Sequence, residues 1–230
     1  MDICLDTNTL LSHLFLAEPY NHEITLYLQN HPHDNYYLTG HVKKECDNIF
    51  YKKQKLFRII LIDFITYLND YHNKIINMDN ILNKFIRSIR GYEFKNEPVS
   101  LEYIKKILSQ IWIDESIQEN TLGYDVFCKF TIFKNNLDYE LFKHKHDLYN
   151  KMIFIPSARR KYGEILNKLI HNGSHEKDNL IILDLYEYHL KNPIGFIFIT
   201  FDNSFYNALI NCSFEFIIDV KNYKNLNKFT

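Results

Sequence analysis

Four acidic residues, each beside an apolar segment, are the strongest candidates for chemistry in this sequence: Asp6, Glu45, Asp178 and Asp202. Carboxylates gathered in one place repel one another and raise each other's pKa, and a divalent cation removes that penalty. Hard oxygen ligands favour Mg²⁺ or Mn²⁺ over Zn²⁺. Such an ion activates a water molecule and neutralises charge on a phosphodiester. If the four side chains converge, they predict metal-dependent hydrolysis of a phosphate ester.

Each acid also has a purely structural interpretation. An Asp that follows a strand commonly caps a helix or forms a turn. An Asp in the first turn of a helix interacts favourably with the helix dipole, and a helical Glu commonly lies on a solvated face. An unrelated α/β protein with scattered acids is therefore an alternative, and the positions of the four carboxylates decide between the two.

The apolar pattern places these acids at the ends of predicted elements. Short apolar runs predict strands at 3–5, 36–39, 152–156, 196–200 and 214–218. Helical spacing predicts helices at 10–16, 41–50 and 157–170, one that starts from an N-cap at Ser174, and one through 208–210. Strands that alternate with helices predict a parallel sheet with helices on both faces. Ligands bind beyond the carboxyl ends of such strands, where Asp6 and Asp202 lie.

The middle of the chain has a different pattern. From about residue 56 to residue 150 the apolar residues follow helical spacing almost throughout. We therefore expect a core formed by residues 1–56 and 151–230 and an all-helical insertion formed by residues 57–150. Without those 94 residues the chain would have 230 − 94 = 136 residues. The apolar faces of the insertion need a partner, which could be the core, other insertion helices or a second copy of the chain.

The two terminal segments resemble the PIN-domain nucleases. The resemblance rests on Asp6-Thr7-Asn8 after an apolar strand, the helical Glu45, Asp178 at the start of an apolar helix, and Thr200-x-Asp202 at a strand end. These motifs occur in the order that the family has. The resemblance implies a three-layer α/β/α core with a central parallel sheet. It also implies a metal-dependent endoribonuclease that leaves 5′-phosphate and 3′-hydroxyl ends.

The resemblance also implies roles for individual residues. Asp6 is the expected central ligand of Mg²⁺ or Mn²⁺, with the catalytic acids Asp178 and Asp202 as further ligands, while Glu45 holds or deprotonates a metal-bound water. Asn8 and Thr200 are expected to orient Asp6 by hydrogen bonds. Asp184 lies about 240° around the helix from Asp178, so a structural or exposed position is expected for it.

Basic side chains near the acids are the predicted contacts for substrate phosphates: Lys43, Lys44, Arg159 and Arg160. The two lysines precede Glu45 on the same predicted helix. The two arginines begin the predicted helix 157–170, whose backbone amides would add to the binding of a phosphate. A solvated helix face is the alternative interpretation of these side chains.

The net charge, the apolar stretches and the cysteines of the sequence limit which partners and which cellular compartment we expect for the protein. The formal net charge is −1, which excludes a polyanion binder that works by bulk charge. No stretch has the roughly 18 apolar residues of a membrane helix, and four unpaired cysteines without metal spacing suggest reduced thiols in a cytoplasm. We expect RNA as the partner and, for a toxin or defence nuclease, an antitoxin or other protein regulator. The alternative function is a catalytically inactive PIN-like module that binds RNA or acts as a scaffold.

Overall fold

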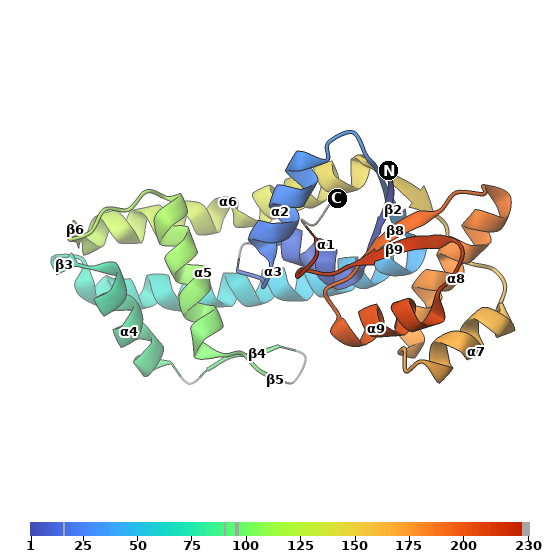
Figure 1. Ribbon diagram of the computed structural model, residues 1–230. Coiled ribbons are helices and arrows are strands. Elements are labelled where there is room, and N and C mark those ends of the chain that lie inside the picture. The colour runs from blue at the N-terminus through green and yellow to red at the C-terminus, as the bar shows by residue number, and fades with distance from the viewer. Residues whose placement is uncertain (16, 90, 95–96, 227–230) are drawn as a thin grey trace. The chain divides into compact units, whose positions relative to one another are not determined.

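The protein is built around a parallel sheet, in a computed structural model that describes residues 1–15, 17–89, 91–94 and 97–226. The five strands are β1 (Asp2–Leu5), β2 (Asn35–Thr39), β7 (Met152–Ile155), β8 (Phe196–Ile199) and β9 (Ile217–Lys221). They lie in the order β7-β2-β1-β8-β9, and each adjacent pair is parallel (Figure 1). The predicted α/β class with a parallel sheet is confirmed.

The chain enters this sheet at its centre. After β1 it adds β2 and β7 on one side, and it then returns to add β8 and β9 on the other side. β1 and β8 are therefore neighbours, with Cys4 opposite Phe198, although they are far apart in the sequence. The crevice beyond the carboxyl ends of two strands at such a reversal is the preferred position for a ligand in open parallel sheets.

The sheet and its helices form one of two compact units. This unit comprises Met1–Asn48 and the chain from Lys145 onward, and the second unit is Ile49–His144. The helices confined to the sheet unit are α1 (Thr7–Leu14), α2 (Asn21–Asn30), α7 (Gly163–His171), α8 (Glu176–Lys191) and α9 (Asn203–Cys212). The long helices α3 (Gly40–Leu68) and α6 (Gly123–Asn150) contribute residues to both units.

Aromatic packing fixes α8 and α9 on one face of the sheet. Tyr37 of β2 contacts Phe196 of β8 edge-on, with ring centroids 5.3 Å apart, and Tyr188 of α8 packs against Tyr37 at 5.9 Å. Phe205 of α9 packs against Phe198 of β8 at 5.4 Å. Because α8 runs down to the start of β8, its N-terminus lies toward the carboxyl ends of the strands. Packing in the core thus directs the starts of both helices toward the same edge of the sheet.

Several predicted boundaries are wrong. The predicted helix 41–50 is the start of α3, which continues to Leu68, and the predicted strand 152–156 ends at Ile155. The last strand begins at Ile217 rather than at residue 214, because Phe214 and Phe216 are buried in the turn before it. The predicted helix 157–170 begins only at Gly163. Ser174 is not an N-cap, since α8 begins at Glu176 with His175 in the cap position.

The second unit is mostly helical but not all-helical as predicted. Besides parts of α3 and α6 it contains α4 (Met78–Ser88), α5 (Leu101–Asp114) and the 3-10 helix η1 (Asn69–Tyr71). Two short antiparallel pairs join β3 (Ile75–Ile76) to β6 (Thr121–Leu122) and β4 (Glu93–Phe94) to β5 (Glu97–Pro98). Its core is aromatic: Phe64 packs against Phe85 and Phe130 with ring centroids 5.1 and 4.9 Å apart.

A buried carboxylate on α8 holds together the start of α3 and the segment that follows β7. Asp184 is fully buried. It accepts hydrogen bonds from the backbone N–H of Ala158 at 2.7 Å and of His41 at 3.2 Å, and its oxygens lie 2.8 Å from Nδ1 of His41. The predicted structural role of Asp184 is confirmed, and the residue is buried rather than exposed.

Removing this carboxylate should destabilise the sheet unit strongly. We expect Asp184→Ala to lower the free energy of unfolding by about 3 kcal/mol or more, because the N–H groups of His41 and Ala158 lose a charged partner. Urea unfolding followed by circular dichroism measures the change. Glu176→Gln, on the exposed first turn of the same helix, is the control and should change stability by less than about 0.5 kcal/mol. A loss for Asp184→Ala no larger than that of the control would contradict this account.

Candidate functional site

Asp6 lies at the reversal in strand order, directly after β1. Its side chain is only 4% exposed. One carboxylate oxygen accepts the backbone N–H of Thr9 at 2.6 Å and caps α1, and the other accepts the hydroxyl of Thr200 at 2.5 Å. Burial raises the pKa of Asp6 to about 6, against the opposing effect of the hydrogen bonds from Thr200 and Thr9, and the charge of Asp202 raises it further. Asp6 is thus a buried acid whose carboxylate is held by the first turn of α1 and by the residue that follows β8.

Asp202 follows the neighbouring strand and caps α9. Its Oδ1 atom accepts the backbone N–H groups of Ser204 at 2.8 Å and Phe205 at 3.0 Å, together with the Ser204 hydroxyl. Burial acts to raise the pKa of Asp202, but these hydrogen bonds outweigh it and lower the pKa below its usual value. Asp202 therefore stays ionised at neutral pH beside the more readily protonated Asp6.

The other two predicted acids approach this pair from α3 and α8. An oxygen of Glu45 accepts the hydroxyl of Thr7 at 2.8 Å, which ties α3 to the first turn of α1. Asp178 lies half-buried in the first turn of α8. Its pKa is raised to about 6, first by burial and then by the negative charges of Asp202, Asp6 and Glu45. The four predicted acids are therefore close enough to interact electrostatically, and we call them the acidic edge.

The acidic edge is not a preformed metal shell. Among the described residues, no three His, Cys, Asp or Glu side chains are positioned to hold one metal ion together. The donor chemistry still fits a hard cation, since all four groups are carboxylates and two of them have raised pKa values because of burial and mutual repulsion. Mg²⁺ usually keeps several waters and binds through only one or two protein carboxylates. The edge fits an ion held in that way.

The hydrogen bonds that orient the acids come partly from residues that the sequence analysis did not select. Thr200 makes the predicted bond to Asp6. Asn8 is exposed, and the structure gives the second bond to Asp6 from Thr9 instead. Thr7 orients Glu45. Thr9 could have been found from the sequence, because an N-cap Asp bonds to the N–H two or three residues later.

His175 is a further residue that sequence reasoning missed. It is exposed in the cap position of α8, and a positive charge on its ring lowers the pKa of both Asp178 and Asp202. A protonated His175 therefore partly compensates the negative charge of the acidic edge. The sequence signal for it is its place three residues before Asp178.

The structure gives the four basic residues that were predicted to contact substrate different surroundings. Lys44 is exposed and lines a pocket of about 340 Å³ together with Glu45. Lys43 instead forms a salt bridge with Asp47 at 3.0 Å. Arg159 and Arg160 are exposed but precede α7 rather than begin it, and the backbone N–H of Arg159 donates to Glu187. Lys44 is therefore the predicted cation that the structure places beside an acid of the edge.

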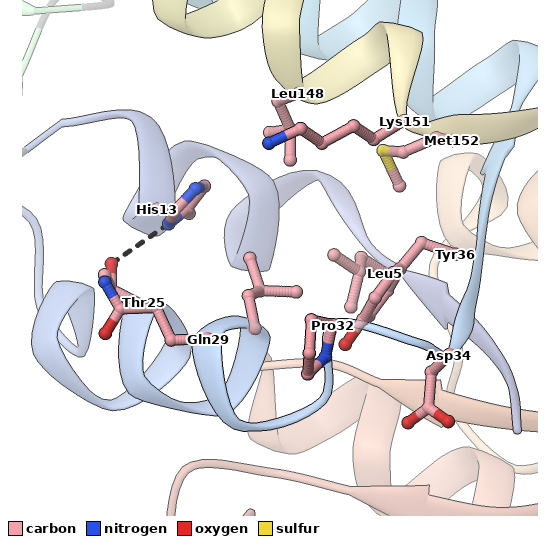
Figure 2. Close-up of a pocket in the computed structure, with 11 residues that line it drawn as sticks. Leu5, His13, Thr25, Gln29, Pro32, Asp34, Tyr36, Leu148, Lys151 and Met152 are labelled. Atoms are coloured by element: carbon pink, nitrogen blue, oxygen red, sulfur yellow. Dashed lines mark hydrogen bonds between the residues drawn. The ribbon is translucent and has the colours of Figure 1, made fainter.

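A larger cavity, of about 580 Å³, includes none of the four acids (Figure 2). Leu5 and Met152 are among its apolar walls, and His13 and Lys151 lie on the side opposite Asp34. One oxygen of Asp34 binds the N-terminal ammonium at 2.7 Å, and the other is buried without a hydrogen-bond partner among the described residues. This cavity could hold a small molecule, but it contains no group of the acidic edge.

No protein-family model, curated protein or solved structure matches the chain. In the part of the chain that the structure describes, no helix combines the length and the apolarity needed to cross a membrane. The geometry and electrostatics of the acidic edge are therefore the basis for a functional assignment.

The raised pKa of Asp6 predicts an unusual dependence of stability on pH. Between about pH 4 and pH 6 the folded state keeps a proton on Asp6 that the unfolded chain has released, so stability falls as pH rises. With a pKa of 3.8 in the unfolded chain and about 6 in the fold, Asp6 alone should lower the free energy of unfolding by up to about 3 kcal/mol across this range. Urea unfolding in EDTA at pH 4.5, 5.5 and 7 measures it. Asp6→Asn should flatten the profile, and a stability that rises with pH in both proteins would refute the prediction.

Two acids of the edge should respond to substitution with opposite signs. Asp178→Asn should raise the melting temperature in EDTA, because it removes a half-buried charge that three other carboxylates repel. Asp202→Ala should lower it by about 2–4 °C, because α9 loses its N-cap. Thermal unfolding at pH 7.5 tests both. A lower melting temperature for Asp178→Asn would show that the four carboxylates are not clustered.

Proposed function

We propose that the protein is a metal-dependent ribonuclease with a PIN-like three-layer core. The observation that carries this proposal is the position of Asp6 and Asp202 after the two strands that flank the reversal in strand order, with Asp178 and Glu45 in electrostatic reach. Perturbed carboxylates at the expected ligand position of an open sheet are a common signature of a functional site.

The roles follow from the environment of each carboxylate. Asp202 stays ionised at neutral pH and would be the anchor for a divalent cation. Asp6 and Asp178, whose pKa values are raised to about 6, are mostly ionised at neutral pH and would be the further ligands. Glu45, held by Thr7 on one oxygen, has its other oxygen available to orient or deprotonate a water. Bound Mg²⁺ or Mn²⁺ would supply Lewis acidity and an activated water for phosphodiester hydrolysis. Thr200 fixes the orientation of Asp6.

A second candidate function is an inactive module that binds RNA or acts as a scaffold. It is favoured by one observation: three potential ligands are not prearranged around one point among the described residues. Asp6 and Asp202 are also the N-caps of α1 and α9, a structural role that an inactive module would keep. The two functions differ in turnover, so a cleavage assay separates them. If the protein acts as a toxin or in defence, we expect it to have a protein regulator, such as an antitoxin, with either of these two functions.

A cleavage assay with matched variants tests the proposed function. A mixed pool of single-stranded RNA and DNA is incubated with Mg²⁺, Mn²⁺ or EDTA, and the products are resolved on a denaturing gel. We expect cutting of RNA that EDTA abolishes. Asp202→Asn should remove this activity while it preserves the cap of α9, because Asn caps helices as well as Asp does. Thr200→Val should reduce activity by about 10- to 100-fold through loss of the bond that orients Asp6.

Glu215→Gln is the control for the loss of one negative charge, because Glu215 is exposed just before β9. It should keep full activity. Equal activity in Asp202→Asn and the wild type would exclude the acidic edge as the catalytic site. An absence of cutting with every metal, in protein that binds RNA, would favour the inactive module.

A further inference from the structure

The pocket of about 340 Å³ beside the acidic edge combines features that favour one ligand chemistry. It lies between α3 and α8, and the residues that matter for the argument are Lys44, Glu45, Asn48, Lys177 and Leu180. Glu45 belongs to both the pocket and the acidic edge. A molecule in this pocket therefore lies next to the proposed reaction centre.

Two lysines from different helices give the pocket its positive charge. Lys44 and Lys177 are both exposed, and in the described part of the chain neither is paired with an acid. Lys43, next in sequence, is held by Asp47 instead. Two unpaired ammonium groups at one pocket favour an anion with more than one negative group, and successive phosphates of a nucleic acid supply such charges.

The other walls suit a nucleobase rather than a phosphate. Leu180 presents an apolar surface at the pocket, and the Asn48 side chain supplies both a donor and an acceptor. A volume of about 340 Å³ falls within the range of small-ligand sites. A base that is stacked and paired in a duplex cannot enter a pocket of this kind without leaving the helix.

We propose that this pocket receives one unpaired nucleotide of a single-stranded RNA, with Lys44 and Lys177 binding the phosphates on either side of it. The proposal rests on the proposed function for its choice of RNA, and it adds a selection for unpaired substrate. Leu180 packs against the base, and Asn48 bonds to its edge. The adjoining phosphodiester is thereby brought to the acidic edge.

Binding measured without turnover tests the proposal. A fluorescent RNA of about 12 nucleotides, single-stranded or annealed to its complement, is titrated in EDTA with the Asp202→Asn protein, and fluorescence anisotropy gives the affinity. We expect tighter binding of the single strand. Lys44→Ala and Lys177→Ala, added to this background, should each weaken that binding by about 5- to 10-fold. Each should also lower the slope of log affinity against log salt by about 0.7.

Two further variants separate the base contact from charge. Leu180→Ser should weaken binding of the normal strand but not of a strand with abasic sites throughout, because only the normal strand places a base on the apolar wall. Lys161→Ala, an exposed lysine that does not line the pocket, should change affinity less than about 2-fold. Thermal unfolding of every variant checks that it is folded.

The outcomes distinguish this proposal from the proposed function. Equal or tighter binding of the duplex, no binding of the single strand, or lysine variants that behave like Lys161→Ala would overturn the pocket proposal, even if the protein cuts RNA. Single-strand binding that depends on Lys44 and Lys177, in a protein that cuts nothing, would support the pocket and refute the nuclease.

Discussion

The hydrogen bond from Thr200 to Asp6 is the contact on which the arrangement of the acidic edge depends. It joins the carboxyl ends of β1 and β8, two strands that are neighbours only because the chain reverses its direction of travel across the sheet. The same region has a backbone bond from Asp6 N–H to the carbonyl of Ile199, and the Thr9 hydroxyl donates to that carbonyl as well. These bonds set the start of α1, and Thr7 on its first turn then positions Glu45. The proposed site is thus assembled by contacts that also build the fold.

Buried and mutually repelling polar groups at and beside the acidic edge lower the stability of the sheet unit. Asp6 is a buried acid with a raised pKa, and Asp178 is raised by burial and by the charges around it. Asn179, next to Asp178, is fully buried with neither of its amide atoms hydrogen-bonded within the described residues, and an unsatisfied buried polar group costs about 1–3 kcal/mol. Asp184 is as fully buried as Asn179, but it has three hydrogen-bond partners: the backbone N–H groups of His41 and Ala158 and the Nδ1 atom of His41. This is how the fold satisfies a buried acid that has a structural role. This difference between two acids of one helix is the strongest electrostatic argument that Asp178 has a function beyond structure.

Much of this arrangement could be predicted from the sequence, because strand and helix periodicities report burial. The apolar runs located all five core strands, and the polar residues that follow β1 and β8 located Asp6 and Asp202. The errors have physical causes. Phe214 and Phe216 have the apolar spacing of a strand, but they lie buried in the turn before β9. The segment at Arg159 is not helical, because the backbone N–H groups of Ala158 and Arg159 donate to the side chains of Asp184 and Glu187. The bond from Thr7 to Glu45 could not be predicted, because α1 and α3 meet only in the folded chain. His175 and Lys177, by contrast, lie within three residues of Asp178 in the sequence and were open to selection.

A difference in salt-bridge pairing separates Lys44, which lines the proposed nucleotide pocket, from its neighbour Lys43. Lys43 and Lys44 are adjacent and chemically identical, yet α3 turns Lys43 toward Asp47, which also binds Lys145 at 2.9 Å, and turns Lys44 toward Glu45 and α8. Asp47 therefore removes one cation from the surface near the edge and leaves the other to bind an anion. Lys177, one residue before Asp178 on α8, lines the same pocket. The first turn of α8 thus carries both Asp178 and Lys177, so in the proposed function this one turn would contribute to metal binding and to RNA binding.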